Sequence, residues 1–372
     1  MIILHIINSL EMGGAEKNLY QICVNDKKNK HIVISLTGSG HFSEAFKKRK
    51  IRVYEINIKK NLFLIFKIVK IINTSKPSVI QTWMYNSDFV GSISSILALK
   101  TNLVWGIRHT NLIPAFEKKR TLIISKILAY LSYFIAKKII VCSSKAMQEH
   151  IKLGYNKKKM IYVPNGCDLD IFYPITHNRK KILSELKIDA SIPLLGSIGR
   201  YNSYKDFDNL FEALNIVKKK DISFNFLLVG KNNDKSNQQL VKLINQNGLN
   251  NRVYLLGLRN DVSKILNSLD LFILSSMSEA FPNVVMEAMA CGTPCVVTDV
   301  GDASYIVEKT GWIVPPKNST ELAKKIEIAI NDLKSPNWQS VRVSANLRIK
   351  EKFTLERMIN SYTKIWDKIK SE

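Results

Sequence analysis

Residues 275–307 read SSMSEAFPNVVMEAMACGTPCVVTDVGDASYIV, and they place two carboxylates on either side of a strand-to-helix turn. The short apolar run at 269–274 predicts a buried strand before this segment. Pro282 suits the first position of a helix, because its missing N–H would be unbonded there anyway. Apolar residues then repeat at helical spacing as far as Cys291-Gly292-Thr293-Pro294, and Cys295–Thr298 reads as the next strand.

The two carboxylates belong to Glu279 and Glu287, eight residues apart in the sequence. The pattern puts Glu279 in the loop at the carboxyl end of the strand and Glu287 one to two turns into the helix. At ~1.5 Å rise per residue the carboxylates should lie roughly 10 Å apart. That span suits the hydroxyls of two linked sugar rings, with helix N–H groups between them to hold phosphate.

This segment resembles the donor-site signature of the retaining nucleotide-sugar glycosyltransferases of family 4, which have the GT-B fold. The match rests on the acidic pair, on Phe281-Pro282 between the two acids, and on Ala-Met-Ala-Cys-Gly-Thr-Pro-Cys-Val at 288–296. The resemblance covers nearly the whole chain. It is strongest from Gly196 to Ile313 and weaker before Lys138.

The resemblance implies a role for each polar group of the segment. Glu287 would accept hydrogen bonds from the donor's ribose hydroxyls, and Glu279 would hold hydroxyls of the donor sugar. Backbone groups between the two acids would contact the sugar or phosphate, which adds Ala280, Phe281, Pro282 and Asn283 to the predicted donor site. The alternative interpretation makes Glu279 a solvated loop acid and Glu287 a surface charge of the helix.

Strands and helices alternate along the rest of the chain, which predicts parallel sheets covered on both faces. The expected strands are Ile2–Ile7, His31–Leu36, Val53–Ile58, Ser78–Gln81, Leu103–Ile107, Lys138–Val141, Pro193–Ile198, Phe224–Val229, Arg252–Leu255, Leu271–Leu274 and Cys295–Thr298. The expected helices are Ala15–Val24, Ile65–Thr74, Lys119–Ala136, Phe207–Lys219, Gln238–Asn247, Val262–Leu266, the donor helix, one from about Ser319, and Leu355–Lys370.

A stretch rich in turn residues at 163–174 separates the two series. The fold class is therefore α/β, with two doubly wound Rossmann-like domains at 1–170 and 171–354. Ligands of such sheets bind at the carboxyl ends of strands where the winding reverses, so two facing edges would form one cleft. By the resemblance, the first is the acceptor-side domain, the second is the donor domain, and the helix at 355–372 crosses back to the first.

A Gly-Gly turn follows the first strand, in Glu11-Met-Gly13-Gly14-Ala-Glu16-Lys. Adjacent glycines let backbone N–H groups approach an anion, and the following helix adds its positive end. The spacing is not GxGxxG, so no nicotinamide site is indicated. The resemblance places Gly13 and Gly14 opposite the donor diphosphate and acceptor, whereas the plain alternative is a tight turn.

Two cations follow the strand at 193–198, in Gly199-Arg200-Tyr-Asn-Ser-Tyr-Lys205-Asp206. In the resembled family, an Arg and a Lys at this spacing are usually followed by Gly, which Asp206 replaces here. Without a metal, a departing nucleotide diphosphate needs fixed cations to take up its charge. We expect Arg200 and Lys205 to supply them, with Asp206 capping the next helix. The alternative is two solvated surface cations.

Three further positions are carried over from the resemblance. His109 ends the strand at 103–107 and would contact the donor sugar, although a lone histidine is often structural, and Arg108 is a weaker acceptor-side candidate. Gly230 ends a strand where the base and ribose approach. Arg259 follows Gly257 and sits where family members grip the edge of the base.

Composition limits the other possibilities. The five cysteines are odd in number and have no CxxC pattern, and the histidines show no ligand spacing, so we expect no metal site and no disulfide framework. Met1–Ile7 reads as a first buried strand rather than a secretory signal. We expect a cytoplasmic protein without a cofactor.

The charge is unevenly distributed. Residues 1–170 carry 27 Lys/Arg against 10 Asp/Glu, a surplus of +17 out of the total +24. Two segments, 59–72 and 118–138, combine basic and apolar residues but are too short to span a bilayer. They suit helices that lie in the headgroup region of the inner face of the cytoplasmic membrane. The alternative is ordinary covering helices with solvated lysines.

The sequence thus predicts a metal-independent, retaining hexosyltransferase with a nucleotide-diphosphate sugar donor, expected to be UDP-linked. Its acceptor would be a glycan or a polyprenyl-diphosphate-linked sugar in lipopolysaccharide O-antigen or capsule synthesis, an assignment made by analogy. A non-hydrolysing nucleotide-sugar epimerase would want extra acids near the sugar, which we do not identify. A basic nucleic-acid-binding protein is permitted by the charge, but no nucleic-acid motif is present.

Overall fold

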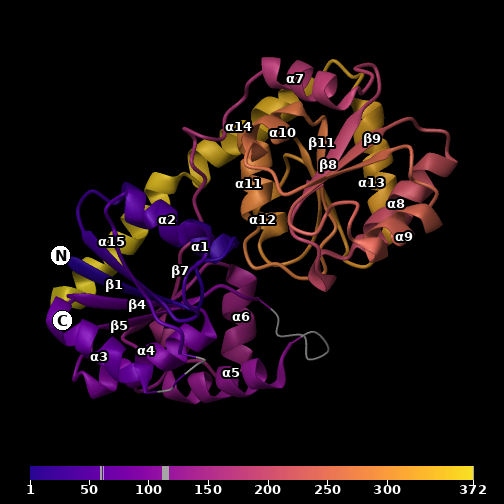
Figure 1. Ribbon diagram of the computed structural model, residues 1–372. Helices are drawn as coiled ribbons and strands as arrows, with labels where there is room; N and C mark the ends of the chain where they lie inside the picture. The colour runs from indigo at the N-terminus through magenta and orange to yellow at the C-terminus, as the bar shows by residue number, and fades with distance from the viewer. Residues whose placement is uncertain (59–60, 62, 111–116, 372) are drawn as a thin grey trace. The chain divides into compact units, whose positions relative to one another are not determined.

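The computed structural model describes residues 1–58, 61, 63–110 and 117–371. The chain forms two compact units (Figure 1). The first contains Met1–Gly166 and Leu355–Glu372, and the second contains Cys167–Thr354.

The first unit is built on a seven-stranded parallel sheet with the order β3-β2-β1-β4-β5-β6-β7. Its strands are β1 (Ile2–Ile7), β2 (Lys30–Ser35), β3 (Arg52–Glu55), β4 (Val79–Trp83), β5 (Leu103–Ile107), β6 (Lys138–Val141) and β7 (Met160–Tyr162). Its helices are α1 (Gly14–Asn25), α2 (His41–Lys48), α3 (Leu64–Ser75), α4 (Tyr85–Leu97), α5 (Lys119–Leu131), α6 (Ser144–Lys152) and α15 (Leu355–Ser371). The winding reverses between β1 and β4.

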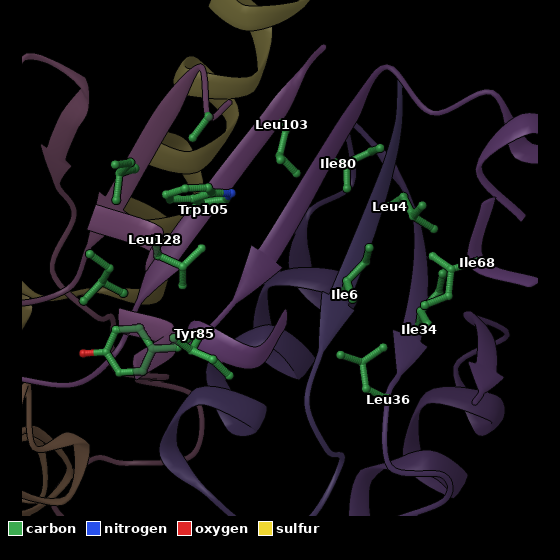
Figure 2. Close-up of a cluster of buried hydrophobic side chains, with 14 of the residues drawn as sticks. Leu4, Ile6, Ile34, Leu36, Ile68, Ile80, Tyr85, Leu103, Trp105 and Leu128 are labelled. Carbon is green, nitrogen blue, oxygen red and sulfur yellow. The ribbon is translucent and has the colours of Figure 1, made fainter. Parts of the chain in front are cut away.

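Each face of this first sheet buries its own core. On one face, strand residues such as Leu4 and Trp105 pack against Ile68 of α3 and Leu128 of α5 (Figure 2). On the other face, α1 and the returning helix α15 cover the sheet, and the fully buried Trp366 belongs to this second core. The last helix of the chain therefore completes the unit formed by the first 166 residues.

The second unit repeats the plan with a six-stranded parallel sheet in the order β10-β9-β8-β11-β12-β13. Its strands are β8 (Leu194–Ile198), β9 (Asn225–Val229), β10 (Val253–Gly257), β11 (Leu271–Leu274), β12 (Cys295–Thr298) and β13 (Trp312–Val314). Its helices are α7 (His177–Leu186), α8 (Phe207–Lys219), α9 (Gln238–Gln246), α10 (Val262–Ser268), α11 (Asn283–Ala290), α12 (Ala303–Val307), α13 (Ser319–Asp332) and α14 (Trp338–Lys352). The reversal of winding falls between β8 and β11, which are paired.

The predicted fold class, two doubly wound Rossmann-like domains, is confirmed. The sequence pattern missed several helices, of which α4 is typical. Its sequence YNSDFVGSISSIL is rich in poor helix formers, and one of its serines, Ser92, donates its hydroxyl back to the Asp88 carbonyl at 2.6 Å. The missed helices are α2, α4, α6, α7, α12 and α14, and the short strands β7 and β13 were missed as well.

Two predicted helix limits were wrong. The helix expected to run to Ala136 ends at Leu131, because Ser132 Oγ donates to the Ala129 carbonyl at 2.6 Å and accepts the Asn156 N–H at 2.9 Å. Pro282 was expected at the first helical position but precedes it, with φ −72° and ψ 99°. Because its backbone is extended, Pro282 is the N-cap of α11 and not its first helical residue.

Candidate active site

Most of the predicted donor-site residues lie at the carboxyl edge of the second sheet, where the winding reverses between β8 and β11. The loops that follow β8 and β11 are held together by two hydrogen bonds. The Met277 N–H donates to the Tyr204 carbonyl at 2.8 Å, and Ser275 Oγ donates to the Lys205 carbonyl at 2.8 Å. The two paired strands thus bring the Arg200–Lys205 loop beside the segment that carries Glu279.

Lys205 and Glu279, two of the predicted site residues, form an ion pair. Lys205 Nζ donates to Glu279 Oε1 at 2.6 Å, and the two side chains are 19% and 18% exposed. Ser276 Oγ donates to the same oxygen at 2.8 Å. Within the described residues, Glu279 Oε2 has no protein donor. The cluster therefore presents one engaged and one open carboxylate oxygen beside a cation.

Arg200 and Asp206 flank this cluster on the β8 loop. Arg200 is exposed, and no carboxylate in the described part of the chain pairs with it. Asp206 has φ +51°, in the left-handed region where glycine is favoured, and this conformation accounts for glycine as the usual residue of the resembled pattern. Asp206 takes the N-cap position of α8 without a side-chain capping hydrogen bond. The expected side-chain cap was wrong, because capping side chains normally sit on extended backbone.

Helix α11 places the second acid. Glu287 is 7% exposed, which excludes the alternative of a surface charge. Pro282, the N-cap of α11, forms no side-chain capping hydrogen bond, and the positive end of the helix dipole lies beside it. Ala280, Phe281, Pro282 and Asn283 form the turn into this helix, as the sequence pattern indicated.

A second turn, which sequence reasoning did not select, supports the Glu279 segment. Gly301 has φ +50°, and a Cβ atom there would overlap the carbonyl oxygens of Glu279 and Ala280. The Asp302 N–H donates to the Ala280 carbonyl at 2.9 Å. Glycine is thus required by a close approach of two loops. The sequence Val300-Gly301-Asp302 gave no sign of the loop that lies against it.

Gly230 is confined by a similar contact at the end of β9. Its φ is +138°, and a Cβ atom would overlap the Gly199 carbonyl. Asn233 clamps the same place, since its Nδ2 donates to the Gly199 carbonyl at 2.6 Å and to the Val229 carbonyl at 3.2 Å. The ends of β8 and β9 therefore lie in direct contact. Asn233 was missed by the sequence analysis because its importance depends on its contact with Gly199, which is distant in the sequence.

Arg259, predicted to grip the base, is engaged within the second unit. It donates to both carboxylate oxygens of Asp261 at 2.8 Å and to Glu185 Oε1 at 2.6 Å. These two carboxylates raise the pKa of the Arg259 guanidinium above its usual value. A role in base binding stays a prediction, and such a role would require Arg259 to share these partners.

The Gly13-Gly14 turn lies at the carboxyl end of β1 in the first unit. Gly13 is the N-cap of α1, and the buried Glu16 lies in the first turn with Oε2 folded over Gly13. Ser9 Oγ donates to Glu16 Oε1 at 3.2 Å. A carboxylate therefore occupies the positive end of the helix, where the sequence pattern predicted a phosphate. Anion binding at this turn stays a prediction, and Glu16 would oppose it.

His109 and Arg108 follow β5 and differ in their surroundings. His109 Nε2 lies 3.0 Å from Glu117 Oε1, with a third of its side chain exposed. Arg108 donates to Asn165 Oδ1 at 2.6 Å and to the Tyr362 hydroxyl, and its guanidinium stacks 4.5 Å above the Trp83 ring. Arg108 thus anchors α15, and its acceptor-side role stays a prediction. His109 stays a candidate sugar contact.

Three residues that the sequence did not connect converge inside the first unit: His5, Cys23 and His31. Trp83 Nε1, which can only donate, lies 3.2 Å from His5 Nδ1, and His5 Nε2 lies 2.9 Å from His31 Nδ1. His31 Nε2 lies 3.2 Å from Asp26 Oδ2. The lone pairs of His5 Nδ1 and His31 Nδ1 are thus each engaged in accepting a hydrogen bond, so the arrangement fits a hydrogen-bonded relay better than a metal centre.

Comparison with known proteins assigns both halves of the chain. The model described as Glycosyltransferase Family 4 matches residues 12–171, and the model described as Glycosyl transferases group 1 matches residues 178–340. The two matches together cover most of the chain, with a break near the boundary between the two units.

Individual relatives point the same way. The chain is similar to N,N'-diacetylbacillosaminyl-diphospho-undecaprenol alpha-1,3-N-acetylgalactosaminyltransferase of Campylobacter jejuni, with 27% identity over 77% of each chain. It is similar to UDP-Gal:alpha-D-GlcNAc-diphosphoundecaprenol alpha-1,3-galactosyltransferase of Escherichia coli, with 26% identity over 85% of this chain and 80% of the relative. The crystal structure of Anabaena HepE with UDP and glucose superposes with a TM-score of 0.87 at 23% identity, over 99% of this chain and all of the other.

Proposed function

Since the chain belongs to family 4 of the glycosyltransferases, which have the GT-B fold, we propose that it transfers a hexose or N-acetylhexosamine from a UDP-sugar. The acceptor is a glycan or a sugar linked to polyprenyl diphosphate, in O-antigen or capsule synthesis. Both named relatives act, by their names, on sugars linked to undecaprenyl diphosphate, and one uses UDP-galactose. HepE was crystallised with UDP, which supports uridine as the base.

The observation that carries the proposal is the Lys205–Glu279–Ser276 cluster at the reversal of winding. Open α/β sheets bind ligands at this place. Here a cation with a partly buried ion-pair partner lies beside an open carboxylate oxygen and a helix start without a side-chain cap. The cation and the start of the helix suit the negative charge of a diphosphate. The open carboxylate oxygen suits a hydroxyl of the sugar.

In the proposed reaction, the acceptor hydroxyl attacks the anomeric carbon of the donor sugar from the side that the nucleotide leaves. A bond forms between the acceptor oxygen and this carbon, while the bond to the phosphate oxygen breaks. The acceptor proton passes to the departing phosphate oxygen, so the configuration at the anomeric carbon is retained. The protein then has to position the two substrates and neutralise the leaving group.

The cluster divides these tasks among its residues. Arg200 can approach two phosphate oxygens with its planar fork, and Lys205 adds a point charge. Lys205 is already paired with Glu279, so the position of its ammonium group is fixed before the donor binds. The diphosphate and Glu279 then share this cation. Glu279 Oε2 remains to accept a hydroxyl of the donor sugar, and the buried Glu287 accepts the ribose hydroxyls. His109 is retained as a candidate contact to the sugar.

The test is thermal denaturation with UDP, GDP and ADP for wild type and for Glu287→Gln. Bound ligand stabilises the folded state by about 2.7 kcal/mol at a hundredfold excess over its Kd. We expect UDP alone to raise the melting temperature of wild type by several degrees, and we expect the variant to lose this rise. Glu308→Gln, at an exposed acid of the same unit, is the matched control.

Two outcomes would contradict the proposal. If no nucleotide stabilises wild type, the carboxyl edge of the second sheet is not a donor site. If UDP-sugar is converted to an epimer at the same rate with and without acceptor, the chain is an epimerase of similar fold.

We propose that the protein acts at the inner face of the cytoplasmic membrane. A polyprenyl-linked acceptor would lie there, and the first 170 residues carry a surplus of +17. Attraction of a basic surface to anionic lipid is the physical reason for this assignment.

A further inference from the structure

The outer side of helices α3, α4 and α5 is a surface that the proposed transfer does not use. The three helices are neighbours on one side of the first sheet (Figure 1). Their inner sides supply core residues such as Ile68 and Leu128 (Figure 2). Their outer sides expose large apolar side chains as well, among them Phe63 and Phe66 at 76% and 58% exposure. Apolar side chains thus occur on both sides of this layer.

Helix α5 shows this pattern most clearly, in an outer stripe formed by Ile123, Ile127, Tyr130 and Phe134. These residues are spaced by four, three and four positions, so they follow one side of the helix and the turn after it. Their exposed fractions are 58%, 40%, 69% and 69%. The rings of Tyr130 and Phe134 lie 5.4 Å apart between centroids. A helix side that faces only water is normally polar.

The charge around the outer stripe has one sign. Residues 56–148 contain 14 Lys/Arg and only two acids, Asp88 and Glu117. Asp88 is 1% exposed, and Glu117 lies against His109. Exposed cations, by contrast, accompany the stripe on α5 itself: Lys119, Arg120 and Lys126. An anionic partner would meet no opposing carboxylate on this helix.

These features distinguish between classes of partner. Interfaces between proteins are depleted in lysine, so this combination is a poor match for a protein partner or a second copy. Aromatic and aliphatic side chains flanked by lysine and arginine are typical of helices that lie in the headgroup region of a bilayer. No helix in the described part of the chain is long and apolar enough to cross a membrane.

We propose that the outer stripe of α5, together with Phe63 and Phe66, inserts into the headgroup region of an anionic lipid surface, with Lys119, Arg120 and Lys126 on the lipid phosphates. This surface specifies how the first unit reaches a lipid-linked acceptor. The choice of lipid as the partner rests in part on the proposed function, because that acceptor is held in the same surface.

The test is cosedimentation of the full chain with vesicles of phosphatidylcholine, with and without phosphatidylglycerol. Wild type is expected to bind the anionic vesicles and to be released by salt. Tyr130→Ser with Phe134→Ser should weaken binding about tenfold or more, since two apolar side chains lose their burial. Val343→Ser with Leu347→Ser is the matched control, because these residues are also four apart and exposed, on α14 of the second unit.

A second pair of variants tests the charges. Lys119→Glu with Lys126→Glu should weaken binding by about fivefold or more for each cation, and should reduce the dependence on salt. Lys180→Glu with Lys181→Glu, two exposed lysines of α7, makes the same change in net charge and should have little effect. Loss of affinity in both pairs alike would mean that total charge, not this surface, drives binding.

Other results would overturn the proposal. It is wrong if wild type ignores anionic vesicles, or if the outer-stripe variant binds them as well as wild type does. It is also wrong if duplex DNA binds at physiological salt and displaces the vesicles. Stabilisation by UDP, measured on the same samples, separates the two proposals. Its absence in wild type that still binds vesicles refutes the donor site alone, and its presence in a non-binding protein refutes the lipid surface alone.

Discussion

Single atoms determine what the Glu279 carboxylate can do. Its Oε1 accepts from both Lys205 and Ser276, which fixes the rotation of the carboxylate and directs Oε2 away from these donors. Ser276 is fully buried and its own carbonyl accepts the Thr298 hydroxyl at 2.6 Å, so its position is set by the neighbouring strand. Ser276 is therefore a positioning residue for the proposed donor site.

Replacing Ser276 by alanine removes one hydrogen bond to a carboxylate, worth about 1.5 kcal/mol or more. We expect the KM for the donor to rise on the order of tenfold, with a smaller change in kcat, because the loosened carboxylate holds the sugar less well. Steady-state kinetics with a UDP-sugar measure this split.

The matched control for that change is Ser268→Ala. Ser268 is also fully buried in the second unit, but among the described residues its hydroxyl bonds only the Ile265 carbonyl, within its own turn. An equal rise in KM for both variants would assign the effect to general loosening of the fold.

Among elements, the site depends on how loops from different strands are pressed together. The turn after β12 supports the turn after β11 through Gly301 and the Asp302 N–H, and the ends of β8 and β9 meet at Gly230. In each case a glycine lies where another backbone approaches too closely for a side chain. The loops are therefore held at fixed spacing before any ligand binds.

Gly301→Ala should disrupt the donor loop, because the added Cβ overlaps the Glu279 and Ala280 carbonyl oxygens. We expect a loss of stability beyond the ~1–2 kcal/mol that a left-handed backbone costs an alanine, together with loss of UDP stabilisation. Urea denaturation and thermal shift measure the two effects. Gly38→Ala controls for the backbone cost alone, since Gly38 has φ +93° with open space around it. Equal losses in both variants would contradict the loop contact.

The two units of the chain are not consecutive in the sequence, because the first is made of two separate segments. Its last helix, α15, belongs to the unit formed by residues 1–166, while the residues between form the other unit. Trp366 of α15 is fully buried, and its Nε1 donates to Gln81 Oε1 at 3.2 Å on β4. Arg108 adds a second tie through Asn165 and the Tyr362 hydroxyl. The first unit is complete only with the end of the chain in place.

Trp366→Ala should cost about 3–5 kcal/mol in the first unit, as expected for loss of a buried tryptophan. Hydrogen exchange should then show faster opening of β1 and β4, while the second unit keeps its protection and its response to UDP. Trp338→Ala, in the core of the second unit, should produce the opposite pattern. Uniform loss of protection by either variant would mean that the two units unfold together.

The alternation of apolar strands and helices carried the fold class, because buried parallel strands leave continuous apolar runs that depend on nothing distant. Helices such as α4 were missed, since the serine-rich sequence of α4 has a weak intrinsic preference for helix and its helical form depends on packing against the sheet. Glu279 and the two cations could be placed on loops after strands, and Glu287 in the following helix, for the same local reason. Their roles in binding stay predictions.

What no local pattern could supply is the pairing of distant atoms. Lys205 and Glu279 are 74 residues apart, and their contact exists because β8 and β11 are paired at the reversal of winding. The Glu16 carboxylate over Gly13, the Arg259 network and the His5–His31 relay likewise depend on neighbours that packing selects. The apolar periodicity of each segment determines whether it forms a strand or a helix. The contact partner of a side chain, by contrast, depends on how the segments pack in the tertiary structure.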